Sequence, residues 1–201
     1  MRIIKLYLII LVIGSCTPMA KILIGYKTPQ HLSNKQIIDL SKKLHIENFP
    51  IYLLDTVYFD KIRLMYDDKN SRKILNQPIM LYFFRYDSLK SFTNNCAYPG
   101  VPKLKWNYFG HFDKYPPLTN YDEKLFNKLL LIDFAKNIHP VINEKKINAF
   151  DEYIFVMFNK TFYRQSKGLI KIILKNYKDY KERIIFINND SYIYTKFEYG
   201  F

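Results

Sequence analysis

The stretch YIFVMFNKTFYRQSKGLIKIILKNYKDYKERIIFINND, residues 153–190, decides the fold of this chain. It begins with an unbroken apolar run over 153–158, which is typical of a strand buried on both faces. A second predicted strand covers 183–187, where Arg183 precedes four apolar residues. Between them, residues 165–180 carry apolar side chains at helical spacing: Leu169, Ile170, Ile173, Leu174 and Tyr177. Strand, helix and strand in this order predict a βαβ unit with two parallel strands.

The segment before this unit also has helical and strand patterns. Ser33 stands three residues before Gln36, the spacing of a capping box at a helix start. The residues that follow at helical spacing predict one inward face: Ile37, Leu40, Ser41 and Leu44. Residues 51–54 then predict a short buried strand, and residues 56–66 a second helix.

Three further elements are expected. Pro78 precedes an apolar run over 79–84, and a turn at 85–88 leads to a second strand over 89–93, which together predict a hairpin. Residues 122–138 predict a helix, with Leu125, Leu129, Ile132 and Ala135 on one stripe. Residues 192–197 alternate in the manner of an edge strand. Residues 96–117 have no regular period and predict a long loop.

Residues 153–190 resemble the first βαβ unit of thioredoxin-like proteins, especially the membrane-anchored thiol-disulfide proteins of Bacteroidetes. The resemblance implies an α/β fold, with a thioredoxin-like mixed sheet and flanking helices. In that family a proline, commonly cis, precedes a later strand, and Pro78 resembles it. Because Pro78 lies before the βαβ unit here, either the order is permuted, or the N-terminal half forms its own βαβ-ββ set.

The defining motif of the family is absent. In those proteins a C-x-x-C opens the long helix, but the matching stretch here is Phe158-Asn-Lys-Thr-Phe-Tyr-Arg-Gln165, and the two cysteine positions fall on or near Phe162 and Gln165. Thiol exchange needs a thiolate and a second sulfur that resolves the mixed disulfide. We therefore expect no catalytic residues and no cofactor. The face near Phe162, Tyr163, Arg164, Gln165 and Pro78 is instead expected to bind a ligand.

The N-terminus resembles the signal of a bacterial lipoprotein. Arg2 and Lys5 precede an apolar stretch over 6–13, the layout of an export signal. Ile13-Gly14-Ser15-Cys16 then resembles a lipobox, which predicts cleavage before Cys16 and acylation of its thiol, for example with palmitate. The apolar run is too short for a transmembrane helix, which needs roughly 20 apolar residues. With Thr17 next to the cysteine, sorting rules favour the outer membrane and the periplasm.

The charge of the chain is strongly positive. The formal net charge of +13 falls to +11 when Arg2 and Lys5 are removed with the signal. Such a balance is often associated with nucleic acid, but the lysines are scattered and an exported, anchored protein seldom meets nucleic acid. We therefore predict a membrane partner through the N-terminal lipid and no nucleic-acid partner.

The second cysteine, Cys96, has no intramolecular partner once Cys16 is acylated. It is either buried and inert, because unpaired cysteine is among the most buried residue types, or a reactive thiol.

The loop around Trp106 is rich in aromatic side chains. Together with nearby lysines they predict either a site for a peptide or glycan or a cover over the core: Trp106, Tyr108, Phe109, His111 and Tyr115. His111 and Asp113 alone do not make a metal site, which needs three or four ligands, so no metal is expected.

These observations predict three segments: a signal peptide over 1–15, a lipidated cysteine and tether over 16–32, and one thioredoxin-like α/β domain over 33–201. The leading functional hypothesis is a periplasmic lipoprotein with a non-catalytic body that binds a protein or peptide. Two alternatives stay open. One is a one-cysteine thiol oxidoreductase that uses Cys96, and the other is an immunity or assembly-accessory lipoprotein.

Overall fold

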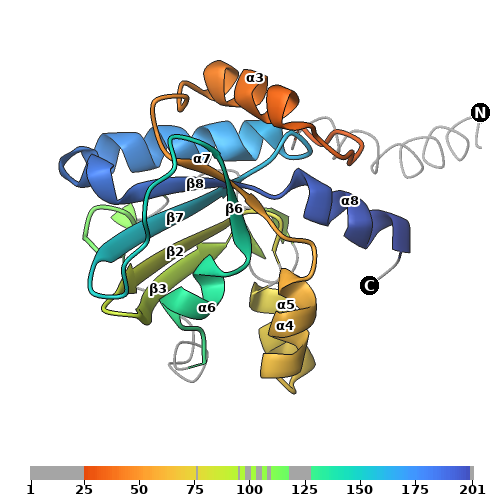
Figure 1. Cartoon of the computed structure of the whole chain (residues 1–201), viewed down its shortest axis with the longest axis horizontal. Coiled ribbons are helices and arrows are strands. Elements are labelled where there is room, and N and C mark those ends of the chain that lie inside the picture. Colours follow the sequence, from red (N-terminus) through yellow and green to blue (C-terminus); the bar gives the residue numbers. More distant parts are fainter. Residues whose placement is uncertain are drawn as a thin grey trace, which may run out of the picture.

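A computed structural model describes residues 25–75, 77–94, 96–97, 101–102, 106–107, 110–117 and 128–199. The described part is built around a six-stranded mixed sheet with helices on both faces (Figure 1). This confirms the expected α/β class.

The strands of the main sheet have the order β3-β2-β7-β8-β1-β6. Their bounds are Ile51–Leu54 for β1, Met80–Arg85 for β2, Ser88–Asn94 for β3, Ile138–Ile142 for β6, Glu152–Phe158 for β7 and Ile184–Asn188 for β8. The pairs β7–β8 and β8–β1 are parallel, while the others are antiparallel. A separate ribbon pairs β4 (Cys96–Ala97) with β5 (Val101–Pro102).

Helices cover the two faces of the sheet unequally. Helices α3 (Asn34–Leu44) and α7 (Tyr163–Asn176) lie together on one face in Figure 1. The short helices α4 (Tyr58–Met65), α5 (Lys69–Leu75) and α6 (Leu131–Ala135) lie on the other. A 3₁₀ helix, η3 (Lys178–Arg183), leads into β8, and α8 (Asp190–Tyr199) leaves the end of β8 and extends past the sheet edge.

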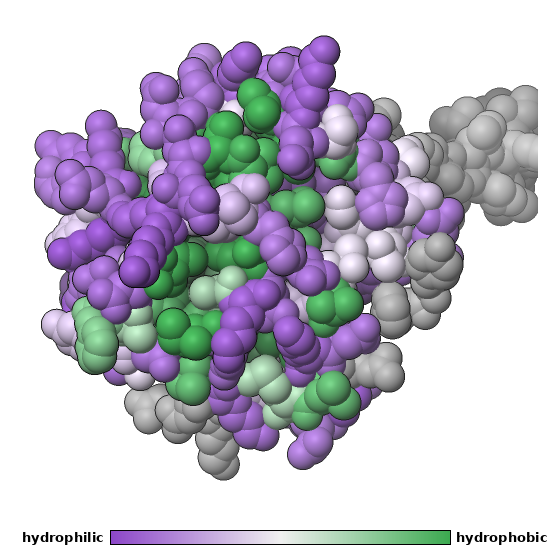
Figure 2. Space-filling view, viewed as in Figure 1, coloured by the Kyte–Doolittle hydropathy of each residue, from purple (hydrophilic) through white to green (hydrophobic). Residues whose placement is uncertain are grey.

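The βαβ unit is confirmed as β7, α7 and β8. Side chains alternate across β7: Ile154, Val156 and Phe158 pack on the α3–α7 face, whereas Tyr153, Phe155 and Met157 pack on the opposite face. Both sets are buried, which explains the continuous apolar run. Outside the core, Figure 2 shows a mainly hydrophilic face with hydrophobic side chains gathered in its middle.

Several other sequence predictions are confirmed. Helix α3 begins after Ser33, which forms the predicted capping box with Gln36, and its buried residues are those of the predicted face. Strand β1 covers 51–54, and α4 lies within the predicted helix 56–66. Strands β2 and β3 form the predicted hairpin, joined by the two residues Tyr86 and Asp87.

Two predictions of secondary structure are wrong. In the described part of the predicted helix 122–138, only 131–135 is α-helical, and β6 begins at Ile138. Pro140, which lacks a backbone N–H, lies in β6 at the edge of the sheet, where a missing donor is tolerated. The segment 192–197, predicted to be an edge strand, belongs to helix α8, because Tyr192 and Ile193 bury adjacent side chains in the core.

The sequence analysis did not predict α5. Its start is fixed by Asp68, whose carboxylate accepts a hydrogen bond from the Ser71 N–H at 2.7 Å, three residues along.

Candidate functional site

The candidate site lies where the parallel strands β7 and β8 end. Strand β7 ends at Phe158 and β8 at Asn188, and these residues are directly paired. Loops that follow the carboxyl ends of parallel strands are the usual place for a ligand in an open α/β sheet. Here these loops carry several of the buried polar side chains of the described residues, among them Asn159, Asn189 and Asp190.

Asp190 is the charged centre of this region. Its side chain is fully buried, and its carboxylate accepts hydrogen bonds from the backbone N–H of Lys160 at 2.8 Å and of Thr161 at 3.2 Å. The Asn188 side-chain amide donates to it at 2.9 Å. Burial raises the pKa of the Asp190 carboxyl above its ordinary value, although these hydrogen bonds act in the opposite direction. Asp190 thus holds the β7–α7 loop against the start of α8.

Two asparagines connect this loop to the β2 strand. The side-chain amides of Asn159 and Asn189 each donate to the Pro78 carbonyl at 2.8 Å. The Asn159 Oδ1 atom accepts a hydrogen bond from the Phe162 N–H at 2.7 Å. Asn159 therefore fixes Pro78 and Phe162 relative to each other. We call Asn159, Asn188, Asn189 and Asp190 the buried polar network.

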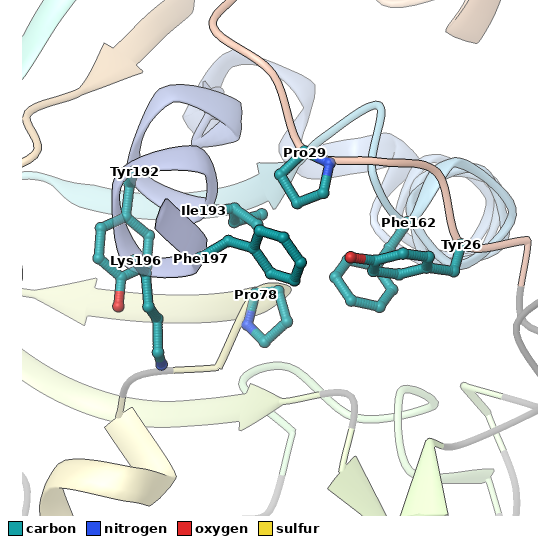
Figure 3. Close-up of a pocket in the computed structure, with 8 residues that line it drawn as sticks. All are labelled: Tyr26, Pro29, Pro78, Phe162, Tyr192, Ile193, Lys196 and Phe197. Atoms are coloured by element: carbon teal, nitrogen blue, oxygen red, sulfur yellow. The ribbon is translucent and has the colours of Figure 1, made fainter. Parts of the chain in front are cut away.

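An apolar pocket of about 340 Å³ opens beside this network. Figure 3 shows Pro29 and Pro78 on opposite sides of the Phe197 ring, with Tyr26 and Phe162 at one end and Tyr192 and Lys196 at the other. The residues that line it, which define the apolar pocket below, are Tyr26, Pro29, Pro78, Phe162, Tyr192, Ile193, Lys196 and Phe197.

The walls of the pocket come from four separate parts of the chain. Tyr26 forms an isolated antiparallel bridge with Phe162, and their rings meet edge to face at 5.5 Å between centroids. The Lys27 N–H donates to the Thr161 carbonyl at 2.7 Å. Leu32 is buried in the core. Residues 25–32 therefore lie against the body, whereas the sequence analysis assigned them to the tether.

Lys196 is the ionisable amine of the pocket lining. Its ammonium lies 5.9 Å from the centroid of the Tyr192 ring. Burial lowers the pKa of Lys196 below its ordinary value, because the charged form loses contact with water. The pocket thus offers mostly apolar surface with one amine beside it, so it suits an apolar group rather than a strongly charged one.

The structure brings together part of the predicted ligand-binding face. Phe162 and Pro78 line the same pocket, as expected if both belong to one site. Gln165 lies in the first turn of α7 and is buried, its Oε1 having no hydrogen-bond partner among the described residues. Tyr163 lies under the Lys27 ammonium at 5.3 Å, and Arg164 is exposed. The Gln77–Pro78 peptide bond is trans.

The aromatic loop contributes to the core instead. Trp106 is buried, packs against α7 and donates from its indole N–H to the Gln165 carbonyl at 3.0 Å. The half-buried Tyr115 stacks on Tyr180 at 4.0 Å between centroids. The His111 ring shares a hydrogen bond with the Thr93 hydroxyl at 3.0 Å. These three positions fit the alternative that the loop covers the core. Tyr108 and Phe109 lie outside the described residues.

Cys16 lies outside the described residues, as does the predicted signal peptide. For Cys96 only the backbone is described, in strand β4. Its reactivity therefore stays a prediction.

Within the described ranges, no three His, Cys, Asp or Glu side chains gather in a way that would bind a metal ion. Among the same residues, no helix has the length and apolarity needed to span a membrane.

Comparison with known protein families, with curated proteins and with solved structures finds no match for this chain.

Sequence reasoning missed most of the pocket lining. Tyr26 and Pro29 were assigned to the tether, and Tyr192, Ile193, Lys196 and Phe197 to an edge strand. A signal was nevertheless present, because Asn159 and Asn188-Asn189-Asp190 directly follow two predicted parallel strands.

Proposed function

We propose that this chain is a lipid-anchored protein of the bacterial envelope, whose thioredoxin-like body binds an apolar peptide segment of a partner protein without chemical reaction. The observation that carries this proposal is the apolar pocket. It contains Pro78 and Phe162, two of the five positions at which the resemblance to thioredoxin-like proteins implies a ligand-binding face.

The strand arrangement supports a permuted thioredoxin-like body. A thioredoxin-like sheet combines a βαβ unit with a hairpin that pairs antiparallel to its first strand. Here β7–α7–β8 is the βαβ unit, and the β2–β3 hairpin pairs with β7. Each of these strands therefore has the same neighbours as in a thioredoxin-like sheet. The order along the chain differs, because the hairpin here precedes the βαβ unit.

The size and chemistry of the pocket favour a peptide side chain as the ligand. About 340 Å³ is near the lower end for small-molecule sites, and it accommodates one or two apolar side chains. Phe197 is 68% exposed at the pocket, so an apolar ligand removes its ring from water. The backbone around the pocket is held by the buried polar network, which limits the entropy lost on binding.

The side chains at the expected thiol positions support binding without catalysis. Phe162 and Gln165 occupy these positions, and neither supplies a thiolate. Phe162 instead forms part of the apolar wall. On this proposal the ancestral site for thiol exchange has become a site that only binds.

The anchor is proposed from the export-signal layout over residues 1–13 together with the lipobox-like residues 13–16. Acyl chains on Cys16 would hold the body at the membrane, since each buried CH₂ contributes about 0.8 kcal/mol. The direct test replaces Cys16 with alanine and follows labelled palmitate in growing cells. Loss of label supports the anchor, and undiminished label contradicts it.

Peptide binding can be measured with the full-length chain in detergent. The probes are blocked, fluorescein-labelled hexapeptides with Leu or Phe at the two central positions and Ser or Gly elsewhere. We expect saturable fluorescence anisotropy with the wild type, and a loss of about tenfold or more in affinity for Phe197→Asp, because the carboxylate must be desolvated. Leu64→Asp is the matched control, since Leu64 is 82% exposed on α4.

Equal binding by Phe197→Asp and wild type would contradict the proposal. Catalysis is tested separately with a disulfide substrate. We expect no turnover, and turnover that Cys96→Ser abolishes would favour the one-cysteine enzyme instead.

A further inference from the structure

A second pocket, of about 430 Å³, lies at the opposite end of the sheet. It opens where β2 ends and β7 begins, beside the end of η3 and the turn that precedes β7. We call it the polar pocket, and the side chains that matter here are Tyr86, Lys145, Phe150, Asp151, Glu182 and Arg183. The apolar pocket lies about 20 Å away, the length of a seven-residue strand.

Two exposed aromatic rings line this polar pocket. Among the described residues, the strongly exposed aromatic side chains are Tyr86, Phe150 and Phe197, with exposures of 66%, 79% and 68%. Single exposed rings are ordinary, but two of these three line one pocket. Exposed rings beside polar groups indicate a ligand that presents both an apolar face and hydrogen-bonding groups.

Tyr86 also adopts an unfavourable backbone conformation. It occupies the first position of the two-residue β2–β3 turn, and both Tyr86 (φ 50°) and Asp87 (φ 58°) are left-handed. Such turns favour Asn and Gly. Asp87 has a structural reason to be there, because its carboxylate accepts the Ile132 N–H at the start of α6 at 2.9 Å. No contact described for Tyr86 requires an aromatic side chain, and strain of this kind is concentrated at functional positions.

Both aromatic side chains are on turns held by hydrogen bonds. The Tyr86 N–H donates to the Asp151 carbonyl at 3.3 Å, which joins the hairpin to the turn before β7. The Phe150 N–H donates to the Asn148 Oδ1 atom at 3.1 Å. These hydrogen bonds therefore fix the backbone that positions the two rings in the absence of a ligand.

The charges around the pocket are balanced. Asp151, Glu152 and Glu182 are matched by Lys145, Arg183 and Arg85, and Glu152 pairs with both arginines. This balance is a local exception in a chain with a net charge of +13. A pocket built for a polyanion would carry excess positive charge, so the balance favours a neutral ligand that both donates and accepts hydrogen bonds.

We propose that the polar pocket binds a neutral saccharide. The carbon-bound hydrogens of a sugar ring form an apolar face that lies flat on the negative face of an aromatic ring. Its hydroxyl groups both donate and accept, which suits neighbouring carboxylates, ammonium and guanidinium groups. Tyr86 and Phe150 supply the stacking surface, and Lys145, Asp151, Glu182 and Arg183 supply the hydrogen bonds. This site is independent of peptide binding at the apolar pocket.

The test uses the full-length chain in lauryldimethylamine oxide, a detergent without a sugar head group. The probes are maltohexaose, cellohexaose, mannohexaose and chitohexaose, with hexagalacturonate as an anionic comparison, and binding is measured by saturation-transfer NMR and calorimetry. We expect at least one neutral hexasaccharide to bind, and Phe150→Ala and Tyr86→Asn each to weaken it by about tenfold. Leu64→Ala should leave the affinity unchanged.

The substitution Tyr86→Asn separates binding from folding, because asparagine suits the left-handed turn while removing the ring. Three results would overturn the proposal: no neutral probe binds, only hexagalacturonate binds, or a neutral probe binds equally to wild type, Tyr86→Asn and Phe150→Ala.

Discussion

The two ends of the sheet carry pockets of opposite construction. The apolar pocket draws its walls from residues near 26–29, 78, 162 and 192–197, and it rests on a buried polar network. The polar pocket is formed by turns, and its ion pairs are partly exposed, with side-chain exposures of 42% for both arginines and 15% for Glu152. The apolar pocket therefore depends on the core, whereas the polar pocket depends on surface turns, so a substitution can disturb one pocket and leave the other intact.

The largest effect is expected from Asp190→Ala. It leaves the N–H groups of Lys160 and Thr161 and the Asn188 amide without their buried acceptor. We expect the free energy of unfolding to fall by about 3 to 4 kcal/mol, measured by urea denaturation. Asp179→Ala, at an exposed position in η3, should change it by less than about 0.5 kcal/mol. Equal effects of the two changes would show that the network does not support the fold.

A smaller loss is expected at the polar end. Glu152→Gln removes the charge shared by Arg85 and Arg183, and because the arginines are partly exposed, we expect a loss of about 1 to 2 kcal/mol. Asp133→Asn is the control, since it breaks the exposed Asp133–Lys136 pair and should cost less than about 0.5 kcal/mol. If Glu152→Gln lowers the free energy of unfolding no more than Asp133→Asn does, the carboxylate shared by two arginines stabilises the fold no more than a single exposed ion pair.

Asp190, in the buried polar network beside the apolar pocket, also predicts that the free energy of unfolding depends on pH. Its pKa is raised in the folded state, so its contribution to stability is fully present below the unfolded pKa and is lost as pH rises through the folded pKa. The stability of the wild type relative to Asp190→Asn should therefore decrease as pH increases from about 4. Urea denaturation of both proteins across this range measures the difference, and an increase with pH would contradict the assignment.

The smallest expected effect is a gain in stability. Tyr86→Asn relieves a left-handed tyrosine in a two-residue turn, and we expect about 0.5 to 1 kcal/mol of added stability. Tyr86→Phe keeps the unfavourable conformation and should change nothing. Thermal unfolding of both variants is the measurement, and destabilisation by asparagine would mean that the Tyr86 side chain supports the turn.

The sequence predicted the elements whose signals are local. The apolar runs of β7 and β8, the helical spacing of α7, and the capping box of Ser33 and Gln36 depend on neighbouring residues only, and all were found. The wrong predictions arose where distant contacts decide. The segment 192–197 has side chains suited to a strand, but packing of Tyr192 and Ile193 against the core makes it helical.

The candidate site was predictable only in part. Phe162 and Pro78 were named because of the family resemblance, and they do line one pocket. The bridge from Tyr26 to Phe162 joins residues more than a hundred positions apart, and no local pattern signals it. Pro140 lies two residues beyond the predicted helix 122–138, where a helix commonly ends, so it did not signal that β6 begins at Ile138.

Entry of a peptide side chain into the apolar pocket can be observed at the methyl group of Ile193. Ile193 lines the pocket, whereas Ile62 on α4 is buried elsewhere. In methyl NMR of the isoleucine-labelled full-length chain, titration with the Leu- and Phe-containing hexapeptides should shift the Ile193 signal and leave the Ile62 signal in place. The same shift in Phe197→Asp should require about tenfold or more peptide. An unmoved Ile193 signal, or an equal shift in Phe197→Asp at the same peptide concentration, would contradict peptide binding at the apolar pocket.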